Sequence, residues 1–208
     1  MWYPATVIEA PEGTAPLTLD QAKRQCGIPL SRTDLDDTLT LLIMAARDHV
    51  ERYCAVRVPS QRLRVKCDRF GDFERVPVAP VQSVASISYR DADGVVQTLD
   101  PTRYELRNDD LTVSIVPAFG VRWPVIQSGS RITVDAVAGY VTAPPALSSA
   151  MLLLVRSQYG LTGSDVNLKK KVVEGIGSRE WDMTGSVDAI TRQAVANFLE
   201  PFRCWPLL

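Results

Sequence analysis

Apolar residues recur at helical spacing over residues 34–55. They return every three or four positions, which is the period of one face of an α-helix. The members of this face are Leu35, Leu39, Leu42, Ile43, Ala46, Val50 and Tyr53. Asp34, Asp36 and Asp37 stand in the first turn, where the positive end of the helix dipole favours carboxylates. The pattern predicts a long helix at 34–55.

A shorter helix is predicted at 19–26, within "TLDQAKRQCGIP". Thr18 and Gln21 match the T-x-x-Q pattern of a capping box, in which each side chain satisfies a backbone N–H of the other residue. Gly27 suits the position just after a helix, and Pro29 stops it.

Helical pattern resumes in "PPALSSAMLLLVRSQYG". Pro145 suits the first helical turn and Gly160 the position after the last one. Leu152 and Leu153 extend the apolar surface around this helix, which indicates packing on several sides or a contact with another subunit. A last helix is predicted at 188–200, because Pro201 ends the pattern.

Between the helices the chain favours strands, because it is rich in Val, Ile, Thr and Tyr with Pro and Gly between the runs. The predicted strands are 62–67, 74–78, 83–90, 95–99, 103–106, 111–116 and 131–137. The clearest pair, 83–90 and 95–99, flanks Asp93-Gly94, the favoured dipeptide of a type I′ turn. These strands predict a small antiparallel sheet or barrel.

Two segments have neither pattern. Residues 1–17 are rich in proline and predict an extended surface arm anchored by Trp2 and Tyr3. Residues 160–187 contain five glycines and a lysine triplet, so no helix fits them. A connection of this length within a compact domain is often functional. Its isolated apolar anchors are Val172, Val173, Ile176 and Trp181.

The order of elements predicts an α+β fold in a single domain, 1–208. A helical core is expected from 17–55 and 144–208, the latter also supplying an extended arm and the closing helix. A small antiparallel β module, 56–143, is inserted between the two helical parts. About four helices are expected in all.

Composition and charge exclude some classes of function. The chain has 208 residues, is 46% hydrophobic and carries a formal net charge of −1. It therefore has no global basic field that would hold nucleic acid by counterion release. No stretch approaches the ~18 apolar residues of a membrane span, and we expect no membrane contact. The first residues show no secretory signal, so synthesis in a bacterial cytoplasm is expected.

Little in the sequence indicates chemistry. The four cysteines, Cys26, Cys54, Cys67 and Cys204, form no C-x-x-C pair and no cluster with the single histidine, His49. We therefore expect no metal site, cofactor or catalytic residue. An alternative from another class is a small hydrolase that uses Cys or Ser with His49, but no partner motif accompanies this histidine.

The chain ends on an apolar segment, whereas free tails are usually polar. Its apolar residues are Phe198, Leu199, Phe202, Trp205, Leu207 and Leu208. Such an end either folds back on the core or docks on a partner. The sequence leaves both alternatives open.

The order of elements resembles the head–tail connector (adaptor) proteins of long-tailed bacteriophages and gene transfer agents, in the branch with a β insertion. The resemblance extends from about 17 to 205, and its most specific parts are "PVQSVASISYRDADG", "VAGY" and "FLEPFR". It implies a structural, non-catalytic adaptor. Another ring of the same neck, a stopper or tail-completion protein, is the nearest alternative.

The resemblance implies a ring, commonly of twelve subunits, below the portal in the neck of a virion or virus-like particle. The ring extends the channel for double-stranded DNA without sequence-specific contacts and docks a tail-side stopper or tail terminator protein. By family position the portal-binding residues are Ile190, Ala194, Phe198, Leu199, Phe202 and Trp205. The arm anchors named above would contact a neighbouring subunit or a partner. Leu152 and Leu153 would form the helix contact between subunits of the ring. The β module is expected to face outward or toward the tail side.

Overall fold

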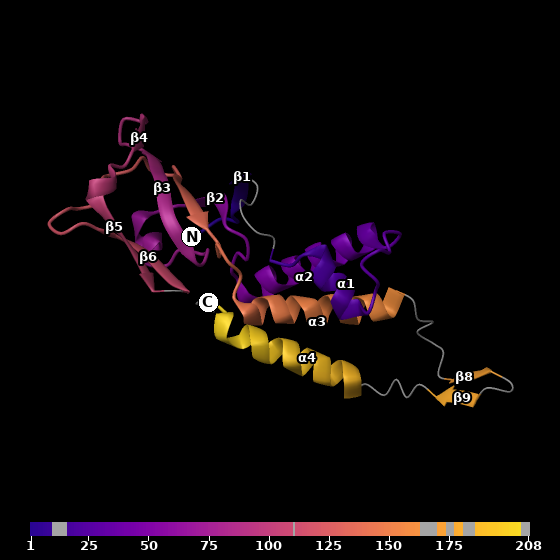
Figure 1. Cartoon of the computed structure of the whole chain (residues 1–208). Coiled ribbons are helices and arrows are strands. Elements are labelled where there is room, and N and C mark those ends of the chain that lie inside the picture. Colours follow the sequence, from indigo (N-terminus) through magenta and orange to yellow (C-terminus); the bar gives the residue numbers. More distant parts are fainter. Residues whose placement is uncertain (10–15, 110, 163–169, 174–176, 181–185, 205–208) are drawn as a thin grey trace. The chain divides into compact units, whose positions relative to one another are not determined.

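A computed structural model describes residues 1–9, 16–109, 111–162, 170–173, 177–180 and 186–204. The chain divides into two compact units. The first, here called the β unit, comprises residues 1–15, 51–143 and 202–208, and the second, the helical unit, comprises 16–50 and 144–201. The fold class is α+β, as predicted (Figure 1).

The main sheet of the β unit is antiparallel and has five strands in the order β1-β2-β7-β3-β4. Their bounds are Thr6–Glu9 for β1, Gln61–Cys67 for β2, Val81–Arg90 for β3, Val96–Thr98 for β4 and Ile132–Ala138 for β7. β7 lies in the middle, although it is the last of the five in sequence. In β2, burial alternates along the strand, because alternate side chains point to opposite faces of the sheet.

A second sheet pairs β5 (Tyr104–Asp109) with β6 (Thr112–Pro117). Short 3-10 turns, η1 (Phe70–Glu74) and η2 (Pro101–Arg103), precede these strands. Aromatic rings join the parts of this unit: Phe70 stacks on Trp123 with centroids 4.8 Å apart, and Phe73 stacks on Trp2 at 5.8 Å. The core of the β unit is therefore one apolar cluster between the sheet, η1 and β6.

The helical unit begins with α1 (Leu19–Cys26), whose bounds agree with the prediction. The Gln21 N–H donates to Thr18 Oγ1 and the Thr18 N–H donates to Gln21 Oε1, which completes the capping box. Gly27 follows in the left-handed conformation, with φ of 70°. α2 (Asp36–Cys54) matches the long predicted helix within two residues at each end; its last turn belongs to the β unit.

α3 (Pro145–Thr162) packs against both α1 and α4 (Ser186–Leu199), and Figure 1 shows α3 and α4 side by side. Leu147, Ala150, Met151 and Val155 of α3 are buried. The predicted stop at Gly160 is wrong, because the helix continues through it to Thr162. Gly160 does not adopt a left-handed conformation here, and one helical glycine costs only about 1 kcal/mol relative to alanine.

The predicted unstructured segment 160–187 contains a strand pair, β8 (Lys170–Val173) with β9 (Gly177–Glu180). Residues 1–17 were predicted to form only an arm, yet β1 pairs with β2 at the sheet edge. The predicted strand 74–78 is absent: residue 74 ends η1 and no strand follows before β3. Pro77 and Pro80 have no N–H to donate to a ladder, which explains this error.

The hairpin between β3 and β4 bends at the predicted place but not with the predicted turn. Asp91 N–H donates to Val95 O and Gly94 N–H to Asp91 O, so the loop has three residues, 92–94. Gly94 has a positive φ of 81°, whereas Asp93 does not, and a type I′ turn requires both. The Asp91 carboxylate accepts from the N–H groups of Asp93 and Val95 and so holds the loop.

Candidate interaction surfaces

The residues predicted to bind the portal do not lie on one surface. Ile190 is 67% exposed and Phe198 40% exposed, while Leu199 is 1% exposed. Nine helical positions separate Ile190 from Leu199, which puts them on opposite sides of α4 because each residue turns the helix by about 100°. Ala194 is half-buried. Leu199 is thus part of the core of the helical unit, and Ile190 and Phe198 carry the free apolar surface of α4.

The remaining portal candidates lie beyond α4. Phe202 belongs to η3 (Glu200–Phe202) and to the β unit, where its ring meets the edge of Tyr140 with centroids 6.4 Å apart. Trp205 lies outside the described residues. Of the arm residues, Val172 and Val173 pair with Ser178 and Gly177 in the β8–β9 ladder.

Two further arm residues, Ile176 and Trp181, also lie outside the described residues. The two predicted ring contacts on α3, Leu152 and Leu153, are half-buried. They follow the buried Met151 on a helix that is already packed against α1 and α4. Their role as subunit contacts stays a prediction.

Sequence reasoning missed an apolar pair on α2. Leu41 is 68% exposed and Met44 50% exposed, and the two stand three positions apart on one helix face. Neither residue belongs to the inward face that the periodicity predicted. An apolar residue outside that face was the signal that could have revealed this pair. In the β unit, Phe119 is fully exposed in the loop that follows β6. These residues and Ile190 are the candidates for contacts with other chains.

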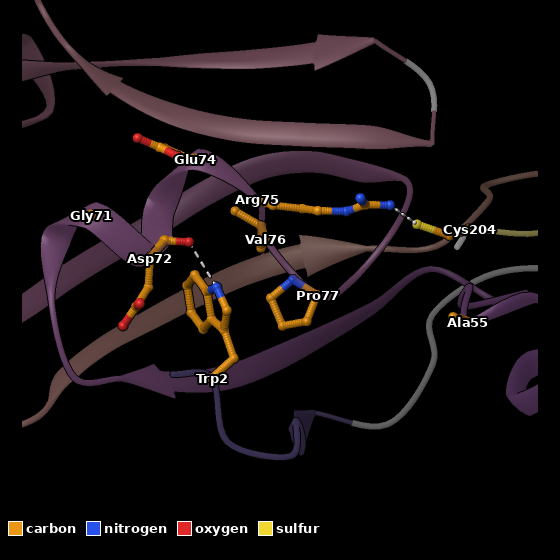
Figure 2. A pocket seen from close by; sticks show the side chains of 9 residues that line it. All are labelled: Trp2, Ala55, Gly71, Asp72, Glu74, Arg75, Val76, Pro77 and Cys204. Atoms are coloured by element: carbon orange, nitrogen blue, oxygen red, sulfur yellow. Dashed lines mark hydrogen bonds between the residues drawn. The ribbon is translucent and has the colours of Figure 1, made fainter. Parts of the chain in front are cut away.

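A cavity of about 380 Å³ opens in the β unit beside η1 (Figure 2). It is lined by Trp2, Ala55, Gly71, Asp72, Glu74, Arg75, Val76, Pro77 and Cys204. The indole N–H of Trp2 donates to the Asp72 backbone oxygen at 2.8 Å, which fixes one wall. Arg75 approaches the Cys204 sulfur at 3.9 Å. No sequence pattern indicated this cavity, because its walls come from four distant parts of the chain.

Several charged groups within the described part of each unit form ion pairs. On β2, Arg64 makes two hydrogen bonds to Asp135 of β7, at 2.7 and 2.8 Å, and these lower the pKa of the Asp135 carboxyl. In the helical unit, buried Lys23 lies 2.6 Å from Asp36 Oδ1 and donates to Leu30 O. Burial raises the pKa of the Cys67 thiol to about 12. These arrangements stabilise the fold and activate no nucleophile.

Among the described residues, no group of three or more His, Cys, Asp or Glu side chains is placed to hold a metal ion. His49, the histidine of the hydrolase alternative, is exposed on α2. No helix within the described part of the chain is long and apolar enough to cross a membrane.

Comparison with known proteins finds a family model that matches part of the chain. Residues 16–98 match the sequence model of the family described as "Phage gp6-like head-tail connector protein". The resemblance to head–tail connectors is confirmed. This family match covers α1, α2 and three strands of the main sheet, β2, β3 and β4, but neither β1 nor β7. A search of curated proteins finds no significant match.

Solved structures extend the connector likeness to nearly the whole chain. One, from "Neck of empty GTA particle computed with C6 symmetry", is 21% identical with a TM-score of 0.70 and covers 99% of this chain and 98% of its own. A second, from the virion of a native gene transfer agent (GTA) particle, is 22% identical with a TM-score of 0.68, covering 98% and 97%.

A third structure, from the neck of a native GTA particle computed with C12 symmetry, is 21% identical with a TM-score of 0.67 and covers 99% and 98%. At such identities the likeness shows the fold. The family description names a head-tail connector protein, and the first and third structures come from the necks of GTA particles. Together they support a structural adaptor in the neck of a phage-like particle.

Proposed function

We propose that this chain forms an adaptor ring between the head and the tail of a phage-like particle, of phage or gene transfer agent type. The observation that carries the proposal is the coincidence of two independent likenesses, the connector sequence at 16–98 and the neck-protein fold over the whole chain. The ring would consist of twelve subunits, in keeping with the C12 and C6 symmetry of the similar necks.

The ring would sit below the portal protein and continue the channel through which double-stranded DNA passes. The formal net charge of −1 supports this role, because a strongly basic bore would hold the DNA instead of letting it slide. A tail-side stopper or tail terminator protein would dock on the opposite face. The protein would be made in the cytoplasm of a bacterial host and function in the neck of the particle.

The portal contact is assigned to the free face of α4. Ile190 is the strongest candidate. Its apolar side chain is two-thirds exposed, so it adds little to the stability of the fold and is available for a partner. Phe198 extends this face toward the end of the helix. Leu199 would support the surface from inside the helical unit.

A matched pair of substitutions tests the proposal. Ile190→Asp puts a charge on the free face, whereas Ala189→Asp puts the same charge on the neighbouring exposed position, about 100° around the helix. In cells that produce the particle, Ile190→Asp should yield DNA-filled heads without tails by electron microscopy. Ala189→Asp should yield tailed particles.

Normal tailed particles from Ile190→Asp would contradict the assignment of α4 to the portal. Cryo-EM of the assembled neck tests the role itself. Density for this chain in a ring directly below the portal is expected, and density anywhere else in the particle would refute the adaptor.

A further inference from the structure

The cavity beside η1 offers an apolar interior. Its walls include the Trp2 indole, Val76, Pro77 and Ala55. The one N–H of the Trp2 indole is already donated to Asp72 O. Figure 2 shows the indole and the proline ring turned toward the same space. The cavity therefore suits an apolar occupant with a flat or branched side chain.

Two acidic residues, Asp72 and Glu74, line this space, and the Asp72 carboxylate is not offered to a ligand. Asp72 Oδ2 accepts from the Met1 ammonium at 2.6 Å, from the Arg69 N–H at 3.0 Å and from the Asp68 N–H at 3.2 Å. A carboxylate with these donors is already satisfied. A cation or a polar small molecule would therefore gain little from Asp72.

The last described residues, 202–204, lie against the β unit beside this cavity. Cys204 N–H donates to Cys54 O at 2.8 Å, and Cys204 lines the cavity itself. The Arg203 guanidinium lies over the Tyr53 ring at 5.1 Å, and Phe202 meets Tyr140. Three successive residues thus hold the chain against the β unit, to which residues 202–208 belong.

The next residues are "WPLL", Trp205 to Leu208. Trp205 starts one Cα step, about 3.8 Å, from Cys204, so the tail reaches the cavity without any rearrangement of its base. Four apolar residues in water would be unfavourable, whereas the cavity offers the apolar surfaces of Trp2, Val76 and Pro77.

We propose that the cavity beside η1 receives the apolar tail, residues 205–208, of the same chain, with Trp205 as its largest contribution. The tail folds back on the β unit in the unassembled protein.

The first test compares the indole N–H signals of the isolated, full-length protein by NMR after Trp205→Ser and Trp181→Ser. The two substitutions remove the same side chain from different units. Trp205→Ser should shift the Trp2 signal and speed its hydrogen exchange by about tenfold, because the cavity opens to water. Trp181→Ser should leave the Trp2 signal in place.

An unchanged Trp123 signal will show that the β core is intact in each variant, since Trp123 stacks on Phe70. A Trp2 signal that does not respond to Trp205→Ser would overturn the proposal. A Trp2 signal in the unmodified protein that changes on hundredfold dilution would assign the tail to the cavity of a second copy, and so contradict docking within one chain.

A second test blocks the cavity from the other side. Gly71 lines it, and a β-carbon there would meet nothing within 4 Å, so Gly71→Ala is tolerated, while Gly71→Leu adds a larger side chain at the cavity wall. Gly71→Leu should expose the tail to carboxypeptidase and red-shift the Trp205 fluorescence, measured as the difference from the matching Trp205→Ser variant. Gly71→Ala should change neither. Equal resistance of the tail in both Gly71 variants would count against the proposal, and neither test depends on particle assembly.

Discussion

Gly139 lies directly against the backbone carbonyl of Pro59. A β-carbon built at residue 139 would overlap the carbonyl oxygen and carbon of Pro59, and φ at Gly139 is +113°. The contact comes just after β7, where Gly139 N–H donates to Pro80 O at 2.8 Å. Gln82 Nε2 also donates to the Gly139 carbonyl at 2.7 Å. The glycine of the "VAGY" segment is therefore required by close approach of two backbones.

Gly139→Ala should lower the free energy of unfolding by about 3 kcal/mol or more, because the new methyl group must displace backbone and the φ value is strained as well. Gly129→Ala is the matched control, since its φ is +76° but a β-carbon there meets nothing within 4 Å. It should cost only about 1 kcal/mol. Urea denaturation of both variants measures the difference, and equal costs would rule out the backbone overlap as the cause.

Removal of the Lys23 ammonium should destabilise the helical unit. Lys23→Ala leaves Asp36 without the charge that lies 2.6 Å from it, and the Lys23 side chain is only 3% exposed. The contact is an ion pair without good hydrogen-bond geometry. We expect a loss of about 3 kcal/mol in the free energy of unfolding.

A double-mutant cycle of Lys23→Ala with Asp36→Ala isolates the pair and should give a coupling of about 1–3 kcal/mol. The control is Arg32→Ala, which breaks an exposed pair with Asp34. It should have no measurable effect. A coupling energy near zero between Lys23 and Asp36 would contradict this prediction. The loss of stability in Lys23→Ala would then come from the buried aliphatic part of the lysine alone.

Acid should remove a contribution that Asp135 makes to stability. Its pKa is lowered by the hydrogen bonds from Arg64, so the folded state holds the charged form more tightly than the unfolded state does. The contribution is then fully present above the unfolded pKa of about 3.9 and is lost as pH falls through the lower folded pKa. Asp135→Asn should cost about 1 kcal/mol at pH 7, since Arg64 is half-exposed and screened by solvent.

Urea denaturation at several pH values between 7 and 2 checks this prediction. The difference between the unmodified protein and Asp135→Asn should shrink as the pH falls below about 4. Glu9→Gln, which weakens the exposed pair with Arg62 on the same sheet, should stay within about 0.5 kcal/mol at every pH. A difference for Asp135→Asn that does not change with pH would show that its charge is not the source.

Alkali should destabilise the fold through Cys67. The folded pKa of this thiol is about 12, above the value of about 8.5 for an unfolded cysteine, because Cys67 is fully buried. The folded state therefore keeps a proton that the unfolded state loses, and stability falls as pH rises above about 8.5, by at most about 1.4 kcal/mol per pH unit. Cys67→Ala should flatten that slope between pH 9 and 11, and identical slopes would refute the assignment.

The elements that sequence could predict are those set by neighbouring residues. α1 is determined by the capping box of Thr18 and Gln21 and by Gly27, all within ten positions, and its bounds agree. α2 and α4 follow from apolar periodicity in the same way. Such local rules need no knowledge of the rest of the chain.

Elements that depend on distant partners were missed. All four residues of β1 are exposed, so no alternation marks it, and it exists because β2 pairs with it from about 55 positions away. Asp93-Gly94 predicted a turn correctly, but the Asp91 side chain determines its type. The sequence predicted that α4 is a helix with apolar residues, whereas only packing shows that Leu199 faces inward and Ile190 outward.

Because β7 lies in the middle of the main sheet, the sheet cannot be completed until the ribosome has made β7. β2 and β3 do not pair with each other; each pairs with β7, which begins only at Ile132. While the ribosome adds the residues between Arg90 and Ile132, β2 and β3 each have an unpaired edge, the one that later pairs with β7. The nascent chain should therefore close its main sheet late, once β7 has been made, and until then these strand edges need protection from aggregation.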